Sequence, residues 1–226
     1  MFKVYIFDLD GTLLDTLGDL AASVNYALRT HGMPEHSVDD VRRFVGNGVR
    51  KLMERAVPQG ADNPTFNEAY NTFREHYMQH SLDTTRPYEG IPETLTALRM
   101  RGCRIAVVSN KMMAATQELC HHFFPDTVEV AIGEDEVHGI RKKPSPDTVF
   151  AALTALGASP SESGEGRGGL NNGLPAVYVG DSDVDIQTAA NAGLPCISVL
   201  WGFRDRDFLI QNGAKTFIST PQELLL

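Results

Sequence analysis

The stretch that decides the fold is Lys3-Val4-Tyr5-Ile6-Phe7-Asp8-Leu9-Asp10-Gly11-Thr12, near the amino terminus. Its first half is mostly apolar and rich in β-branched and aromatic residues, as expected for a strand that is buried on both faces. Its second half places two carboxylates, a glycine and a hydroxyl directly after that strand. Because ligands of open α/β sheets bind at the carboxyl ends of the strands, this stretch predicts both a buried strand and a site.

Further apolar runs of strand length recur along the chain, separated by longer segments of helical period. They cover residues 104–109, 128–132, 176–180, 196–200 and 216–218. Strands that alternate with amphipathic helices indicate βαβ units and a parallel sheet. We therefore predict the α/β fold class, with a Rossmann-like parallel sheet as the core.

One region interrupts the alternation of strands and helices. Between about residues 16 and 82 the sequence shows only helical patterning, in segments 17–28, 41–57 and 66–78. The stretch Arg86-Pro87-Tyr88-Glu89-Gly90 follows it, and its proline and glycine suit a hinge. We predict an α/β core domain of residues 1–14 and 86–226, with a helical cap domain of residues 15–85 inserted into it.

A second unusual segment covers residues 159–173, Ser-Pro-Ser-Glu-Ser-Gly-Glu-Gly-Arg-Gly-Gly-Leu-Asn-Asn-Gly. Its glycine, serine and asparagine content buries too little apolar surface to order a chain. We predict a flexible loop within the core, between a helix and the strand at residues 176–180.

Composition and charge exclude several classes of function. The net charge of −9 argues against nucleic acid as a main partner, because duplex binding relies on basic patches. The three cysteines, Cys103, Cys120 and Cys196, lie far apart, which is typical of reduced thiols in a cytoplasmic protein. No apolar run approaches the roughly 20 residues of a membrane span, and Asp8 interrupts the first run too early for a signal peptide. We expect a cytoplasmic monomer or homodimer with neither membrane nor nucleic-acid partners.

Polar side chains that suit phosphate chemistry follow several of the predicted strands. They are Asp8 and Asp10, Ser109 and Asn110, Lys143, and Asp181 and Asp185. Two carboxylates about 4 Å apart repel by roughly 4 kcal/mol at an effective dielectric of 20, so such a cluster needs a cation. Oxygen ligands without histidine or cysteine favour Mg²⁺, and the neighbouring serine and lysine suit a phosphate. These residues predict a magnesium-assisted phosphoryl site.

The chain resembles the haloacid dehalogenase superfamily of phosphatases, and especially its branch of phosphoglycolate phosphatases with a helical cap. The superfamily motifs occur in order as Asp8-Leu9-Asp10-Gly11-Thr12, Ser109-Asn110, Lys143-Pro144-Ser145-Pro146 and Gly180-Asp181-Ser182-Asp183-Val184-Asp185. The resemblance covers essentially the whole chain, although residues 159–173 are longer than the family's usual connection at that point.

The resemblance implies a chemical role for each core carboxylate. Asp8 would attack phosphorus and become an aspartyl-phosphate, which splits one hard step into two. Asp10 would protonate the leaving alkoxide and then deprotonate the water that hydrolyses the intermediate. Mg²⁺ would be held by Asp8, the backbone carbonyl of Asp10 and Asp181, while Asp185 would orient the metal shell or Lys143.

The resemblance also implies a binding site for the transferring phosphoryl group. Ser109 and Lys143 would hold its oxygens, together with backbone N–H groups near Leu9 and Asn110. In relatives with this cap, substrate choice comes largely from the cap. The segment Phe44-Val45-Gly46-Asn47-Gly48-Val49-Arg50-Lys51 resembles the cap's substrate loop.

We hypothesise that Asn47 and Arg50 contact the non-phosphate end of the substrate. A glycine-punctuated turn between two helices, with a solvated arginine, explains the same residues equally well. Other residues near the motifs also have simpler interpretations. Ser182 is typical of a helix cap, and Lys142 of a solvated neighbour of Lys143. Trp201-Gly202-Phe203 suits either a place near the site or a packed aromatic segment.

The function expected from the resemblance is Mg²⁺-dependent hydrolysis of a small-molecule phosphate monoester, with phosphoglycolate as the first substrate to consider. A β-phosphoglucomutase-like phosphotransferase shares the core motifs, and a pyrophosphatase or nucleotidase of the same superfamily is also compatible with them. Haloacid dehalogenase activity is disfavoured, because Asp10 belongs to the phosphoryl-transfer members. A non-catalytic phosphate-binding protein is disfavoured as well, since none of the motifs is degraded.

Overall fold

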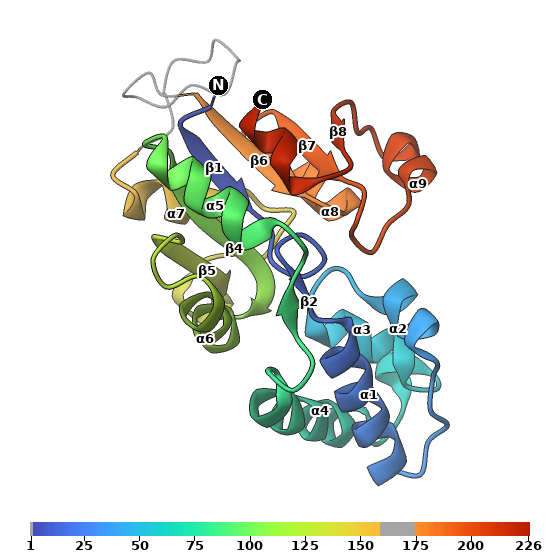
Figure 1. Ribbon diagram of the computed structural model, residues 1–226. Coiled ribbons are helices and arrows are strands. Elements are labelled where there is room, and N and C mark those ends of the chain that lie inside the picture. Colours follow the sequence, from blue (N-terminus) through green and yellow to red (C-terminus); the bar gives the residue numbers. More distant parts are fainter. Residues whose placement is uncertain (1, 159–174) are drawn as a thin grey trace. The chain divides into compact units, whose positions relative to one another are not determined.

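The computed structural model describes residues 2–158 and 175–226 (Figure 1). The predicted flexible loop at residues 159–173 lies outside this described part. The chain divides into two compact units, one formed by Met1–Leu14 and Pro87–Leu226 and the other by Asp15–Arg86.

The first unit is built on a six-stranded sheet in the order β5-β4-β1-β6-β7-β8. Its strands are β1 (Val4–Phe7), β4 (Arg104–Met112), β5 (Val130–Glu134), β6 (Ala176–Gly180), β7 (Cys196–Val199) and β8 (Phe217–Ile218). Each neighbouring pair is parallel. Strand β1 lies in the middle, where Ile6 pairs with Ala106 on one side and Tyr178 on the other. The predicted Rossmann-like α/β class is confirmed.

Helices cover both faces of this sheet. They are α5 (Ile91–Met100), α6 (Met113–Phe123), α7 (Asp147–Ala155), α8 (Asp183–Asn191) and α9 (Arg206–Gln211), with short 3-10 turns η2 (Glu136–His138) and η3 (Pro221–Leu225). Because successive strand residues point to opposite faces, β1 contributes to two cores. Tyr5 and Phe7 pack with α5 and α6, whereas Val4 and Ile6 pack with α7 and α8. Each fully buried aliphatic or aromatic side chain contributes roughly 1.5–3 kcal/mol, so β1 is held firmly.

Strand β4 departs from the sequence-based expectation at its carboxyl end. The predicted strand stops at Ser109, but β4 continues to Met112. Its pairing with β5 shifts register between Val108 and Met112, which marks a bulge. Bulges redirect side chains, and this one carries the polar residues that follow Val108.

The second unit is helical. Its elements are α1 (Leu17–Thr30), α2 (Val38–Phe44), α3 (Val49–Ala56), α4 (Phe66–His80) and the 3-10 turn η1 (Gly60–Asp62). The helical patterning expected across residues 41–57 is divided between α2 and α3. Gly46, Asn47 and Gly48 separate them, with φ angles of 119°, 64° and 86°. An α-helix cannot continue through three residues with positive φ, so α3 begins anew at Val49.

Two short strands, β2 (Leu14–Asp15) and β3 (Arg86–Pro87), pair with each other where the chain passes from one unit to the other. At two residues each, they are too short to show a strand pattern in the sequence. Within the described ranges, every helix falls short of the length and apolar character needed to cross a membrane.

Candidate active site

Asp8 lies at the carboxyl end of the central strand. Its N–H donates to the carbonyl of Val179 at 2.9 Å, which continues the contact between β1 and β6 beyond Phe7. The carbonyl of Leu9 then accepts hydrogen bonds from the N–H groups of Leu13 and Leu14, both at 3.0 Å. This tight turn follows Asp8 directly, so the nucleophile candidate stands on a rigid strand end with its side chain buried.

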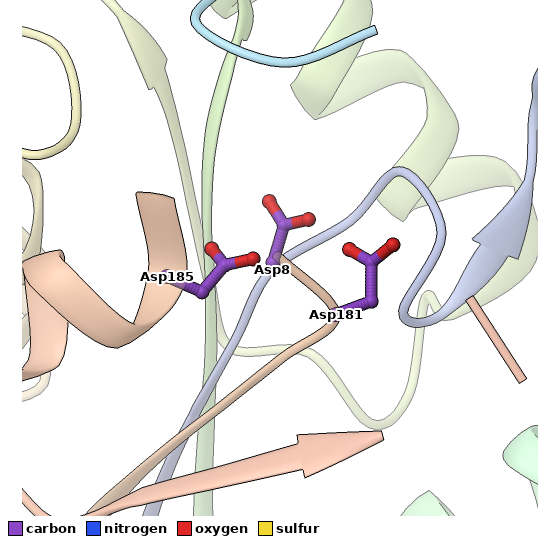
Figure 2. A group of neighbouring side chains, drawn as sticks. All are labelled: Asp8, Asp181 and Asp185. Atoms are coloured by element: carbon purple, nitrogen blue, oxygen red, sulfur yellow. The ribbon is translucent and has the colours of Figure 1, made fainter. Parts of the chain in front are cut away.

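Two further carboxylates meet Asp8 at this edge of the sheet. Figure 2 shows Asp181, which follows β6, and Asp185, from the first turn of α8, beside Asp8. One oxygen of each lies within 4.8 Å of the others, and all three residues are buried. Among the described residues, this group has the donors and the spacing to hold a metal ion.

The placement of Asp185 follows from the start of α8. The N–H and Oγ of Ser182 donate to Asp185 Oδ2 at 3.1 Å and 2.6 Å, which caps the helix. Ser182 is thus a cap residue, as the simpler interpretation has it. A Cβ on Gly180 would lie 2.4 Å from Asp185 Cβ, so glycine is needed for α8 to approach the strand end.

Lys143 binds two of these carboxylates from the loop before α7. Its Nζ lies 2.6 Å from Asp8 Oδ1 and 2.8 Å from Asp185 Oδ1. It also contacts the hydroxyl of Tyr178 at 3.1 Å, and that hydroxyl donates to Asp185 Oδ1 at 2.9 Å. Burial would lower the pKa of Lys143, but the carboxylates of Asp185 and Asp8 outweigh burial and raise this pKa. Lys143 therefore stays a cation.

When no metal is bound, the pKa values of Asp8 and Asp181 lie above the ordinary value for an aspartate. Burial raises the pKa of Asp8 well above its usual range; Lys143 opposes this rise, and Asp185, Asp181 and Asp10 add to it. Burial, with help from Asp185, raises the pKa of Asp181 to about 7. A bound cation would favour the ionised form of both groups, because opposite charge offsets desolvation.

Asp10 faces a different set of partners. Lys111 Nζ lies 3.0 Å from Asp10 Oδ1, and the Oγ of Ser109 is 3.5 Å from Asp10 Oδ2. The side chain of Asn110 instead hydrogen-bonds the backbone of Lys143. The sequence reasoning did not single out Lys111. Its place two residues after Ser109 gave no usable signal, because the predicted strand ended at Ser109 whereas β4 continues to Met112.

The segment after β7 also reaches this site. The N–H of Phe203 donates to Asp181 Oδ2 at 2.7 Å, and the indole N–H of Trp201 donates to the carbonyl of Thr12 at 3.0 Å. A Cβ on Gly202 would lie only 2.3 Å from Asp181 Cβ. Trp201 also packs on the core. This segment is therefore both close to the site and part of the aromatic packing.

The cap candidates lie in the second unit. Asn47 has a φ of 64° in the turn before α3. The guanidinium carbon of Arg50 lies 5.0 Å from the ring centre of Phe66 and 5.6 Å from that of Tyr70. The Arg50 Nε also lies 3.5 Å from Glu54 Oε1, and half of the Arg50 side chain is exposed. An ion pair and cation–π contacts within this unit therefore hold a partly solvated cation.

Fold and site together define the class of this protein. It is a Rossmann-like α/β enzyme whose central strand ends in a buried carboxylate paired with a lysine, at the edge where such sheets bind ligands. More narrowly, the chain belongs to the haloacid dehalogenase-like hydrolase family, whose model matches residues 5–199. This match confirms the family predicted from the motifs, and it identifies the protein as a hydrolase.

Three known proteins illustrate the similarity. A phosphoglycolate phosphatase of Aquifex aeolicus is 34% identical over 203 residues, 89% of this chain and 86% of that protein. An N-acetylmuramic acid 6-phosphate phosphatase of Pseudomonas aeruginosa is 29% identical over 225 residues, 99% of this chain and 93% of that protein. A crystal structure from Lactobacillus delbrueckii subsp. bulgaricus, provisionally described as a phosphoglycolate phosphatase, has a TM-score of 0.86 at 33% identity. It covers 99% of this chain and 96% of its own.

Proposed function

We propose that this protein is a Mg²⁺-dependent phosphatase that hydrolyses a small-molecule phosphate monoester through an aspartyl-phosphate on Asp8. The observation that carries the proposal is the buried contact of 2.6 Å between Asp8 Oδ1 and Lys143 Nζ, beside two more carboxylates. One edge of the sheet thus offers a nucleophile for phosphorus, a cation for phosphoryl oxygens and ligands for a metal.

The donors at this edge fit Mg²⁺. Asp8 and Asp181 offer carboxylate oxygens, and the backbone carbonyl of Asp10 would complete the protein's ligand set. Asp185 is less suited to be a ligand, because its Oδ1 accepts from Lys143 and Tyr178 and its Oδ2 from Ser182. Its proposed task is to orient Lys143. When bound, Mg²⁺ would neutralise charge on the phosphoryl oxygens.

In the first half of the reaction, a carboxylate oxygen of Asp8 attacks phosphorus and the bond to the ester oxygen breaks. Asp10 gives its proton to the leaving alkoxide, a step typically worth about 10²–10⁴ in rate. Lys143 and Ser109, with the backbone N–H groups of Leu9 and Asn110, hold the phosphoryl oxygens during the transfer.

In the second half, water attacks phosphorus and the bond to Asp8 breaks, which releases phosphate and restores the carboxylate. Asp10, now ionised, takes the proton of the attacking water. The same carboxyl group therefore serves first as acid and then as base, and each turnover returns it to its starting state.

The substrate we propose carries a carboxylate. The names of two relatives specify phosphoglycolate and N-acetylmuramic acid 6-phosphate, and both compounds are phosphate monoesters with a carboxylate. We propose that Asn47 and Arg50 contact the non-phosphate end of the substrate, because a partly exposed guanidinium suits an anionic group.

The test of the chemistry is phosphate release from a panel of esters: phosphoglycolate, N-acetylmuramic acid 6-phosphate, sugar phosphates, nucleotides and pyrophosphate. Each compound is assayed with Mg²⁺, with chelator, and with the variant Asp8→Asn. We expect magnesium-dependent release from the carboxylate-bearing esters that is lost in Asp8→Asn. Turnover that requires a sugar bisphosphate would instead identify a phosphotransferase, and release that survives in Asp8→Asn would refute the nucleophile.

The test of the cap residues is the kinetics of Asn47→Ala and Arg50→Ala. We expect a raised KM for the best carboxylate-bearing ester and a smaller effect on a simple aryl phosphate. Arg42→Ala is the matched control, since Arg42 is an exposed arginine of the neighbouring helix α2. Unchanged kinetics in both variants would remove Asn47 and Arg50 from the substrate site.

A further inference from the structure

Lys111 is a buried lysine that the mechanism above does not use. Its side chain is 1% exposed, and its Nζ lies 3.0 Å from Asp10 Oδ1. Lysine is rarely fully buried unless it is paired, so this contact accounts for how the chain tolerates the charge. Desolvation offsets most of the Coulomb attraction in a buried ion pair, so stability alone is a weak explanation for it.

The strand geometry aims Lys111 at Asp10. Residues two apart share a face of a strand, and both Ser109 and Lys111 contact the Asp10 carboxylate. The intervening Asn110 points to the backbone of Lys143 instead. The Lys111 N–H also donates to the Oγ of Ser109 at 3.1 Å, which ties the two residues together within the bulge.

We propose that Lys111 is a positioning residue that holds Asp10 in the orientation needed for proton transfer. This inference rests on the proposed function, in which Asp10 is the acid and base. The Lys111 ammonium holds Oδ1 at 3.0 Å, and the other oxygen, Oδ2, is turned toward Ser109 Oγ. Oδ2 is therefore the oxygen that exchanges the proton.

The location of Oδ2 agrees with this assignment. It is the oxygen on the side of Ser109 Oγ, which the proposed function places against the phosphoryl group. As the bond between phosphorus and the ester oxygen breaks, Oδ2 gives its proton to that oxygen. In the second half, Oδ2 receives a proton from the attacking water, while Lys111 keeps all of its own protons throughout.

The leaving group provides a readout that a purely structural role would not change. An alkyl phosphate needs its leaving oxygen protonated, whereas the nitrophenolate of p-nitrophenyl phosphate leaves without such help. We expect Lys111→Met to lower kcat/KM by about 10²-fold for the alkyl ester, here phosphoglycolate, and by much less for p-nitrophenyl phosphate. Lys215→Met, on an exposed lysine, is the matched control and should leave both values unchanged.

A double-mutant cycle keeps the test decisive if Lys111→Met folds poorly. In an Asp10→Asn background the ion pair between Lys111 and Asp10 is already gone, so the second substitution no longer removes that contact. We expect Lys111→Met to cost about 10²-fold in kcat/KM beside Asp10 but little beside Asn at that position.

Each outcome decides the question. A leaving-group-dependent loss and a non-additive cycle support the positioning role. Equal losses for both esters, or the same loss in the Asp10→Asn background, would overturn it. Failure of the wild-type protein to release phosphate from either ester would count against the proposed function itself, so the two failures are distinguishable.

Discussion

Asn110 and Lys143 are joined by reciprocal hydrogen bonds. The N–H of Lys143 donates to Asn110 Oδ1 at 2.7 Å, and Asn110 Nδ2 donates to the carbonyl of Lys143 at 2.9 Å. A side-chain amide thereby binds the backbone of the catalytic lysine candidate as a paired strand would. Because the N–H and the carbonyl of Lys143 are both hydrogen-bonded, this contact fixes the backbone position from which the Lys143 side chain extends.

The first prediction concerns this contact. Asn110→Ala leaves the buried N–H and carbonyl of Lys143 without their partners, which costs about 1–3 kcal/mol of stability for an unsatisfied group. We also expect kcat to fall about tenfold or more, because Lys143 would lose its fixed position relative to Asp8. Urea denaturation and steady-state kinetics measure the two effects. Asn191→Ala is the control, since Asn191 bonds the carbonyl of Pro144 from an exposed position; an equal loss of kcat there would contradict the prediction.

The second prediction concerns Tyr178. Burial is the main reason that its pKa is raised, so the hydroxyl remains a neutral donor to Asp185. Tyr178→Phe removes this donor and the contact with Lys143, and we expect a loss of about 0.5–1.5 kcal/mol in stability. We expect kcat to fall while KM changes little, because the hydroxyl acts through Lys143. Tyr5→Phe is the matched control, as the Tyr5 hydroxyl makes only a long contact of 3.4 Å with the carbonyl of Leu224.

The third prediction links magnesium to pH. The folded pKa of Asp181 is about 7 and its ordinary value is 3.8, so the folded metal-free state binds the extra proton. Such a group stabilises the fold fully below pH 3.8 and loses this contribution as pH rises through about 7. The contribution of Asp181 to the stability of the metal-free protein should therefore fall as the pH rises from 3.8 to about 7.

Mg²⁺ bound at the proposed site would interact with the ionised carboxylates, so its stabilising effect should grow in the same direction. We expect the difference in Tm between Mg²⁺ and chelator to be larger at about pH 8 than at about pH 5.5. Asp181→Asn should abolish most of this difference. An equal Tm difference at both pH values would argue against a metal bound by Asp8 and Asp181.

The fourth prediction concerns the helical unit. Asp19, in the first turn of α1, is buried and accepts hydrogen bonds from the N–H and hydroxyl groups of both Thr84 and Thr85, at 2.5–3.1 Å. Asp19→Ala should cost about 2 kcal/mol or more, because several donors lose a charged acceptor. Asp39→Ala, on an exposed residue of α2, should change stability by less than about 0.5 kcal/mol. Thermal unfolding compares the two variants, and similar melting temperatures would contradict the proposed importance of Asp19.

The sequence was sufficient for those features that depend on local pattern. The run at residues 176–180 matches β6, and the run at 3–7 matches β1 apart from its first residue. Apolar periodicity is a property of neighbouring residues, so it survives without knowledge of the fold. Asp8, Asp181 and Asp185 could be placed at one sheet edge for the same reason, since parallel strands bring their carboxyl ends together.

Other features were invisible to local pattern. The bulge that extends β4 to Met112 depends on pairing with β5, and the separation of α2 from α3 depends on positive φ at Asn47 between two glycines. From the sequence alone, Lys111 is expected to be exposed to solvent. A lysine is rarely buried unless it has a partner, and the sequence does not show which residue that partner is. That partner, Asp10, lies about a hundred residues earlier in the chain.

The sequence by itself therefore determined the parallel α/β core, the family and the chemical types gathered at its edge, because these follow from short patterns and strand polarity. Only the tertiary structure decided which groups pair: Lys143 with Asp8 and Asp185, Lys111 with Asp10, and the Phe203 N–H with Asp181. Such pairs join distant segments. Their geometry depends on packing and desolvation across the whole core, which no stretch of sequence contains alone.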